Sequence, residues 1–247
     1  MKEKIVNLGF SDREAQELIN VSKNIEEDYK RLLNKYPIQY LIGYVDFYGY
    51  KIFVNDSVLI PRYETEFLVE KLIKYIKKYY KSEKVNILDI GTGSGCISIA
   101  LQKMLDCNIT AVDISQDALK IAKKNSKYNN CNIKFIKSDL NDKISEKFDI
   151  IVSNPPYISY DEEVMESVKL YEPSLALYAD SNGLYYYEKI LQNISKNLKN
   201  KFIIAFEIGY KQAESIKNLI YKYLGSIKVI VKNDLSNKNR YIFIINE

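Results

Sequence analysis

The chain has 247 residues, of which 47% are apolar and 28% are charged, enough for one α/β domain with a small extra module. A net charge of +4 is too small to indicate a nucleic-acid-binding protein, and the absence of histidine excludes Ser-His-Asp and Cys-His catalysis and histidine-ligated zinc. Three widely spaced cysteines, without a signal core or membrane-spanning segment, predict a cytoplasmic protein with no disulfide framework and no metal site.

The first 63 residues predict a small module followed by a hairpin. Residues 11–35 are charged and have helical periodicity, and Ser11 and Glu14 have the spacing of an N-terminal capping box. Aromatic and β-branched residues around Gly49 predict a short hairpin over residues 47–54. We therefore expect a helical substrate-binding domain over residues 1–45 and a hairpin linker over residues 46–63.

Helices and strands alternate over the rest of the chain, starting with an amphipathic helix at residues 64–80. The expected strands cover residues 85–90, 109–112, 133–136, 148–152, 201–207, 227–231 and 241–245. The expected helices between them cover residues 97–105, 116–128, 183–198 and 211–223. This alternation predicts a Rossmann-like α/β domain over residues 64–247, with a parallel sheet covered by helices.

A glycine-rich loop, Gly91-Thr92-Gly93-Ser94-Gly95, follows the first of these strands and opens a helix. Such a loop brings backbone N–H groups close to a ligand, although by itself it can also be a plain turn. Neither reading frame has the third glycine of the dinucleotide fingerprint, which disfavours a pyrophosphate. Asp113 ends the next strand, where a carboxylate can accept hydrogen bonds from both ribose hydroxyls. The glycine loop and Asp113 together predict an adenosyl site. Asp89 is expected to stabilise the loop by accepting hydrogen bonds from backbone N–H groups.

The segment Asn154-Pro155-Pro156-Tyr157 follows the strand that starts at Phe148. Its two prolines donate no N–H and hold the local carbonyls rigidly, so the segment presents acceptors. A primary amide, or an amino group on a base, has two N–H donors and a delocalised lone pair. If the Asn154 oxygen and the Pro155 carbonyl each accept one N–H, that lone pair can point at a methyl donor. Tyr157 is expected to pack against the flat group, so the segment predicts methyl transfer to planar nitrogen.

Together these segments resemble the release-factor glutamine methyltransferases of the PrmC/HemK type. The resemblance extends from about residue 36 to residue 241. It rests on six segments in the same order, at residues 37–49, 59–66, 91–95, 153–158, 172–184 and 234–240. Two features depart from the family pattern. Tyr63 stands where the family usually has proline, and the helical module before residue 36 is shorter than is typical of the family.

The resemblance implies a seven-stranded class I methyltransferase sheet whose last strand is antiparallel, and a helical domain that grips a release factor. It implies S-adenosylmethionine as the cofactor, held by the glycine loop, Asp113 and Asn154, with Asp139 and Leu140 beside the adenine. It also implies that residues 154–157 hold the glutamine of the Gly-Gly-Gln loop of class I peptide chain release factors, in support of translation termination. No nucleic acid or membrane partner is expected.

Other functions remain open at this point. A methyltransferase that acts on the amino group of adenine or cytosine must flip its base out of the duplex and bind the phosphate backbone. It would need a recognition domain and a basic channel, and the sequence shows neither clearly. A ribosomal-protein glutamine methyltransferase is disfavoured by the segment at residues 60–66, and a non-catalytic adenosyl-binding protein by the intact residues 154–157. Arg62, Glu64 and Glu66 fit either a functional role or a salt-bridge cluster at the start of a helix.

Overall fold

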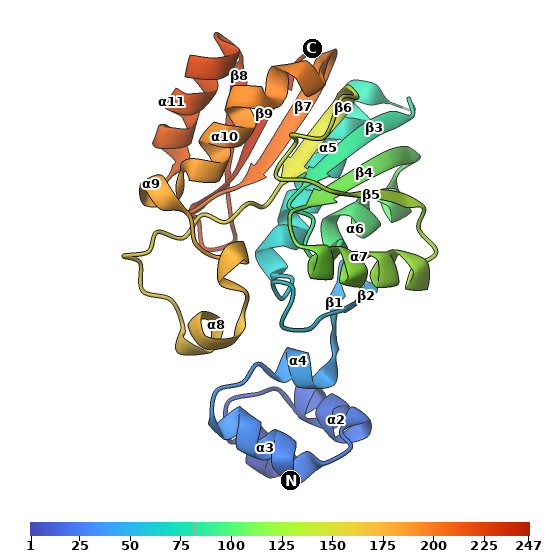
Figure 1. Ribbon diagram of the computed structural model, residues 1–247, viewed down its shortest axis with the longest axis vertical. Helices are drawn as coiled ribbons and strands as arrows, with labels where there is room; N and C mark the ends of the chain where they lie inside the picture. Colours follow the sequence, from blue (N-terminus) through green and yellow to red (C-terminus); the bar gives the residue numbers. More distant parts are fainter. Residues whose placement is uncertain (82) are drawn as a thin grey trace.

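The computed structural model describes residues 1–81 and 83–247. From the bottom to the top of Figure 1, the chain forms a helical module, a short hairpin and an α/β domain built around one large sheet. Among the described residues, none of the helices combines the length and the apolar composition needed to cross a lipid bilayer.

The N-terminal module contains the helices α1 (Lys2–Val6), α2 (Asp12–Val21), α3 (Ile25–Leu33) and α4 (Ile38–Ile42). They pack around a small apolar cluster that includes Ile5, Leu18, Leu32 and Ile38. The predicted capping box is confirmed, because the Ser11 hydroxyl accepts from the Glu14 N–H and the Glu14 carboxylate accepts from the Ser11 N–H. The helical pattern at residues 11–35 corresponds to the two helices α2 and α3, and the side chain of Asn24 caps the second.

The hairpin consists of β1 (Tyr44–Phe47) and β2 (Tyr50–Phe53), which pair antiparallel. Its first strand begins before the predicted range of residues 47–54, which covers only the last residue of that strand, the turn and the second strand. The turn has left-handed φ angles of +53° at Tyr48 and +79° at Gly49, so the predicted turn at Gly49 is confirmed. The division into segments 1–45, 46–63 and 64–247 stays a prediction.

The large sheet has seven strands in the order β5-β4-β3-β6-β7-β9-β8. Strands β3 to β7 are parallel to one another, and β9 is antiparallel to both of its neighbours, as the resemblance implied. Their bounds are β3 (Val85–Ile90), β4 (Cys107–Asp113), β5 (Ile133–Lys137), β6 (Phe148–Ser153), β7 (Leu198–Glu207), β8 (Lys228–Asn233) and β9 (Asn239–Asn246). The predicted α/β fold with a seven-stranded sheet is therefore confirmed.

Helices cover both faces of this sheet (Figure 1). One face packs against α5 (Tyr63–Tyr80), α6 (Cys96–Met104) and α7 (Gln116–Tyr128), and the other against α10 (Tyr185–Asn193) and α11 (Ala213–Leu224). Neighbouring strand residues such as Ile87 and Leu88 belong to opposite cores, as strand periodicity requires. Short elements that the sequence did not predict are α8 (Glu166–Tyr171), α9 (Asp180–Gly183) and the 3-10 turn η1 (Ser174–Ala176). The helix predicted at residues 183–198 is α10 followed by the 3-10 turn η2 (Ile194–Asn197).

Candidate active site

The glycine loop and the Asn-Pro-Pro-Tyr segment lie next to each other at one edge of the sheet. They follow β3 and β6, which are hydrogen-bonded neighbours with Ile90 opposite Ser153. Asp113 ends β4 on the other side of β3. Because the carboxyl ends of parallel strands share one edge, three segments that are far apart in the sequence converge at this edge.

The glycine loop folds into a compact cradle between β3 and α6. The N–H groups of Gly91 and Thr92 both donate to the Val112 carbonyl at 2.9 Å, which ties the loop to the neighbouring strand. Gly91 and Gly93 have φ angles of +71° and +54°, which L side chains rarely adopt, and a Cβ on either would meet no protein atom within 4 Å. The backbone conformation, rather than crowding by the protein, therefore requires glycine at these two positions.

Asp89, the second-last residue of β3, stabilises this loop through its side chain. Its side chain is fully buried, and its Oδ2 accepts hydrogen bonds from the hydroxyls of Thr92 and Ser98 at 2.7 Å each. The predicted support is thus present, and the hydroxyl groups of Thr92 and Ser98 supply it together with the backbone N–H of Ser98. Burial raises the pKa of Asp89 to about 6, and its Oδ1 has no hydrogen-bond partner among the described residues.

Asp113 faces the same loop. Its Oδ2 accepts from the Gly93 N–H and its Oδ1 from the Ser115 N–H, both at 2.8 Å, so the carboxylate links the glycine loop to the start of α7. Each carboxylate oxygen can accept a further hydrogen bond, so both acceptors predicted for a ribose remain usable. Burial raises the pKa of this carboxyl group above its usual range.

A cavity of about 270 Å³ opens between these loops. All but one of the predicted cofactor residues line it, namely Gly91, Thr92, Gly93, Ser94, Asp113, Asp139, Leu140 and Asn154. Gly95 is the exception, because it caps α6, and a Cβ there would lie 3.2 Å from the Cβ of Ala122. Its role is close packing of the loop against α7.

A second cavity of about 430 Å³ lies on the other side of Asn154. Tyr157, Glu207 and Arg240 line it, together with residues of the segment around α8, including Met165. Asn154 and Pro155 border both cavities, and Pro156 borders the first. The two cavities therefore adjoin at Asn154 and Pro155, and they also share Leu59, Arg62 and Ala176.

Tyr157 is anchored at both its side chain and its backbone. Its hydroxyl donates to Glu207 Oε1 at 3.4 Å and accepts from Arg240 Nη1 at 3.5 Å. Its carbonyl accepts from Gln212 Nε2 at 2.9 Å. Burial, followed by the nearby Glu207 charge, raises the pKa of the phenol above its usual range, so this side chain stays neutral. The hydroxyl belongs to a polar cluster, and contact of the ring with a substrate stays a prediction.

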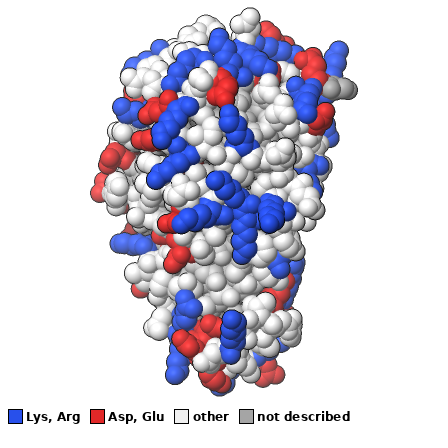
Figure 2. Space-filling view, turned by 45° about the vertical axis from the view of Figure 1, so that its right-hand side comes forward, with Lys and Arg blue, Asp and Glu red and all other residues white. Residues whose placement is uncertain are grey.

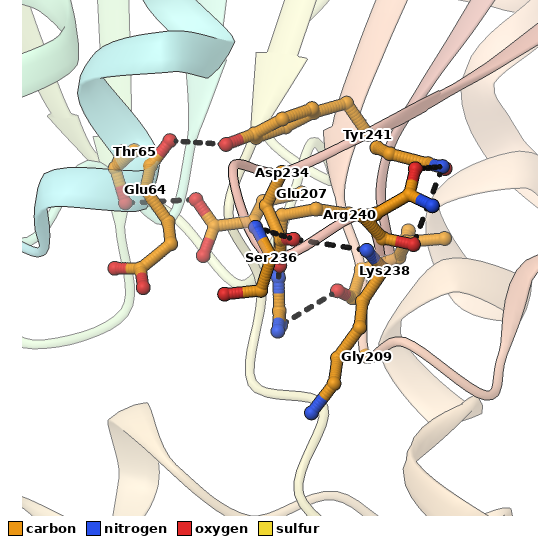
Figure 3. A network of polar contacts seen from close by, with 12 residues as sticks. Glu64, Thr65, Glu207, Gly209, Asp234, Ser236, Lys238, Arg240 and Tyr241 are labelled. Atoms are coloured by element: carbon orange, nitrogen blue, oxygen red, sulfur yellow. Dashed lines mark hydrogen bonds and ion pairs between the residues drawn. The ribbon is translucent and has the colours of Figure 1, made fainter.

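Glu207 and Thr65 are polar residues near Asn154 that were not predicted as site residues. Glu207 is 1% exposed, and its Oε2 accepts a hydrogen bond from the Thr65 hydroxyl at 2.7 Å (Figure 3). A signal did exist in the sequence, because Glu207 directly follows the apolar run from Phe202 to Phe206. A polar residue at the carboxyl end of a parallel strand marks a site by the same rule that marked Asn154.

Comparison with known proteins identifies the family of this chain. Residues 63–170 match the family model described as "Methyltransferase small domain". A release factor glutamine methyltransferase of Lactococcus lactis is 41% identical over 247 residues, covering 99% of this chain and 86% of the relative. One of Streptococcus pneumoniae is 44% identical over 223 residues, covering 89% of this chain and 78% of the relative. The chain belongs to the release factor glutamine methyltransferase family.

The fold is shared more widely than the family. A methyltransferase of Pyrococcus furiosus superimposes with a TM-score of 0.59 at 20% identity, covering 80% of this chain and 89% of that one. At this identity the similarity concerns the fold alone.

Within this family member, the three charged residues near the start of α5 do not form one salt-bridge cluster. Arg62 pairs instead with the buried Glu172, at 2.5 Å from Nη2 to Oε1. Glu66 accepts a hydrogen bond from the Tyr48 N–H of the hairpin turn at 3.1 Å. Glu64 lines the second cavity, as Arg62 does. The interpretation as a local helix-start cluster was therefore wrong, because the partners come from distant segments.

Gly183 packs closely against the Tyr157 carbonyl and the Gln212 side chain that binds it. Its φ is +78°, and a Cβ at this position would lie 2.0 Å from the Tyr157 oxygen and 2.4 Å from Gln212 Nε2. We expect Gly183→Ala to lower the free energy of unfolding by roughly 1–3 kcal/mol and to reduce methyl transfer, because the Tyr157 loop must move. Denaturant unfolding measures the first effect. Gly225→Ala is the matched control, since its φ is +70° but a Cβ would meet nothing within 4 Å. Equal losses in the two variants would contradict a role for crowding.

Proposed function

We propose that this protein transfers a methyl group from S-adenosylmethionine to the side-chain amide nitrogen, N5, of the glutamine in the Gly-Gly-Gln loop of class I peptide chain release factors. The enzyme would act in the cytoplasm, where translation termination takes place. The observation that carries the proposal is the position of Asn154 and Pro155, which border both the cavity of the glycine loop and the second cavity.

The first cavity fits the cofactor by its chemistry. The left-handed glycine backbone and the spare lone pairs of the Asp113 carboxylate suit an adenosyl group with its two ribose hydroxyls. Asp139 and Leu140 line the same cavity and would lie beside the adenine. When bound, S-adenosylmethionine supplies an electrophilic methyl group on a sulfonium.

The protein's own contribution to the reaction is orientation. The Asn154 side-chain oxygen and the Pro155 carbonyl would each accept one N–H of the glutamine amide, which turns the nitrogen lone pair toward the first cavity. These acceptors are held in place by the fold, so they also favour the positive charge that develops on nitrogen. No proton has to be removed from the amide before transfer, and the chain indeed has no histidine for that task. As the N–C bond forms, the methyl–sulfur bond breaks, and the positively charged nitrogen then loses one N–H proton to solvent.

The surroundings of the second cavity suit a protein partner. Met165, which lines the cavity, is 71% exposed, and Leu170 on the adjoining helix α8 is 57% exposed. The helix contacts the N-terminal module, because Tyr171 donates to the Asn34 carbonyl at 2.7 Å and Lys35 pairs with Glu166. A glycine-rich loop could insert its glutamine here while the rest of the release factor lies across α8 and the module.

The acceptor is tested with labelled cofactor and three substrates: an intact bacterial release factor, its Gln→Glu variant in the Gly-Gly-Gln loop, and DNA or RNA. We expect label only in the intact factor, at the amide nitrogen, as located by mass spectrometry. An isolated loop peptide should be methylated poorly, because binding energy from the rest of the factor is lost. Equal labelling of the Gln→Glu variant would contradict the proposal.

The DNA or RNA substrate in this experiment tests the main alternative, a methyltransferase that acts on amino groups of nucleic acid bases. Figure 2 shows a group of basic side chains near the middle of one face, with acidic side chains close to it. A continuous basic channel would be needed to grip a phosphate backbone around an extruded base. Transfer of label to DNA or RNA at a rate similar to that of the release factor would overturn the assignment.

A further inference from the structure

The orientation of the Asn154 amide group is decisive for the proposed reaction. An asparagine side chain can be turned by 180° about its last bond, which exchanges an acceptor oxygen for a donor NH₂ group at nearly unchanged shape. Only the oxygen can accept an N–H from a glutamine amide. With the NH₂ group facing the second cavity, two donors would oppose each other, so some feature of the fold must select one orientation.

A chain of two hydrogen bonds makes this selection. Asn154 Nδ2 donates to the Thr65 hydroxyl at 3.3 Å, and that hydroxyl donates to Glu207 Oε2 at 2.7 Å. A hydroxyl has a single proton, and an ionised carboxylate can only accept. Once the Thr65 proton is committed to Glu207, Thr65 can only accept from Asn154. The Asn154 nitrogen then faces Thr65, and its oxygen is left for the substrate.

We propose that Thr65 and Glu207 are positioning residues, which hold the Asn154 amide with its oxygen toward the glutamine. The inference rests on the proposed function and adds to it the groups that set the acceptor. Thr65 lies on the first turn of α5 and is 3% exposed, so water does not compete readily for its hydroxyl. Neither residue needs to touch the substrate for this role.

The groups around Glu207 come from four parts of the fold. Arg240 of β9 favours the ionised carboxylate, and Glu64 of α5 disfavours it. Tyr157 donates to Oε1 at 3.4 Å, and Tyr187 of α10 donates to the backbone carbonyl of Glu207 at 2.7 Å. The Tyr241 hydroxyl donates to the Glu64 carbonyl at 2.7 Å and so fixes the start of α5 against β9 (Figure 3).

The protonation state of Glu207 sets the direction of these two hydrogen bonds. Burial raises the pKa of Glu207 to about 7, and the hydrogen bond from Thr65 is the largest opposing effect. Below that pH the protonated carboxyl group can donate to Thr65, which frees the Thr65 proton to donate to the Asn154 oxygen. The amide then turns the wrong way. Above that pH the carboxylate is ionised and the productive orientation dominates, so the transfer rate should rise with pH through about 7.

The test compares Thr65→Val, which removes the hydroxyl at nearly constant volume, with Thr65→Ser, which restores it. We expect Thr65→Val to lower the single-turnover rate on intact release factor by about tenfold or more, with cofactor affinity changed by less than about threefold. Thr65→Ser should stay within about threefold of wild type. Thr110→Val is the matched control, because Thr110 is a buried threonine on β4 that lines neither cavity.

The pH dependence of the transfer rate distinguishes a positioning role of Thr65 and Glu207 from a role in packing alone. At saturating cofactor and release factor, the wild-type single-turnover rate should rise between about pH 6 and 8.5, and this step should be absent in Thr65→Val and in Glu207→Gln, which cannot ionise. A wild-type rate in Thr65→Val, or an unchanged pH step in Glu207→Gln, would overturn the proposal. Transfer by the wild-type enzyme tests the proposed function alone, and only differences among the variants test the positioning residues.

Discussion

Replacing Asn154 with alanine is expected to lower the single-turnover rate of methyl transfer by about 10²-fold or more, while the affinity for S-adenosylmethionine stays nearly unchanged. The variant loses the oxygen that would accept one glutamine N–H and orient the nitrogen. The cofactor cradle should persist, because its internal hydrogen bonds involve Asp89, Asp113 and the loop backbone rather than the Asn154 side chain.

Rapid-quench measurement of single-turnover transfer, together with calorimetric titration of the cofactor, distinguishes the two effects of Asn154→Ala. Asn132→Ala serves as the control, since Asn132 is exposed and lines neither cavity. Transfer near the wild-type rate in Asn154→Ala would refute the proposed orientation mechanism. A large loss of cofactor affinity would instead assign Asn154 mainly to the first cavity.

Replacing Asp113 with alanine is expected to weaken cofactor binding by about two to four orders of magnitude. The variant loses acceptors for two ribose hydroxyls, and hydrogen bonds to a charged group are worth roughly 1.5–3 kcal/mol each. It also leaves the N–H groups of Gly93 and Ser115 without their carboxylate partner, so the loop itself becomes less well ordered.

Calorimetric titration with S-adenosylmethionine measures the effect of Asp113→Ala, and circular dichroism checks that the fold is retained. Asp117→Ala is the control, because it removes a nearby acidic side chain on α7 that is exposed and forms a salt bridge with Lys120. An unchanged dissociation constant in Asp113→Ala would mean that the ribose site has been misplaced.

The sequence by itself determined the local features of the site. The strand at Val85–Ile90 and the helix at Gln116–Tyr128 have the predicted bounds, because apolar periodicity, glycines and caps act over a few neighbouring residues. The seven-stranded sheet and its antiparallel last strand followed from the resemblance and are confirmed by the strand pairing. The sequence also placed the glycine loop and Asn154 at the carboxyl ends of parallel strands, whereas the pairing of β3 with β6 that makes them neighbours came from the structure.

Only the tertiary structure decided which distant side chains meet. Thr65 and Glu207 are 142 residues apart and Arg62 and Glu172 are 110 apart, and no periodicity within one segment encodes such pairs. Asn125 shows the same limit: it looks like a misplaced polar residue in α7, yet it is fully buried and joins the Phe53 carbonyl of the hairpin to the Ser94 carbonyl of the glycine loop, each at 2.9 Å. A buried polar group needs a partner, but which partner it finds depends on how the strands and helices are packed together.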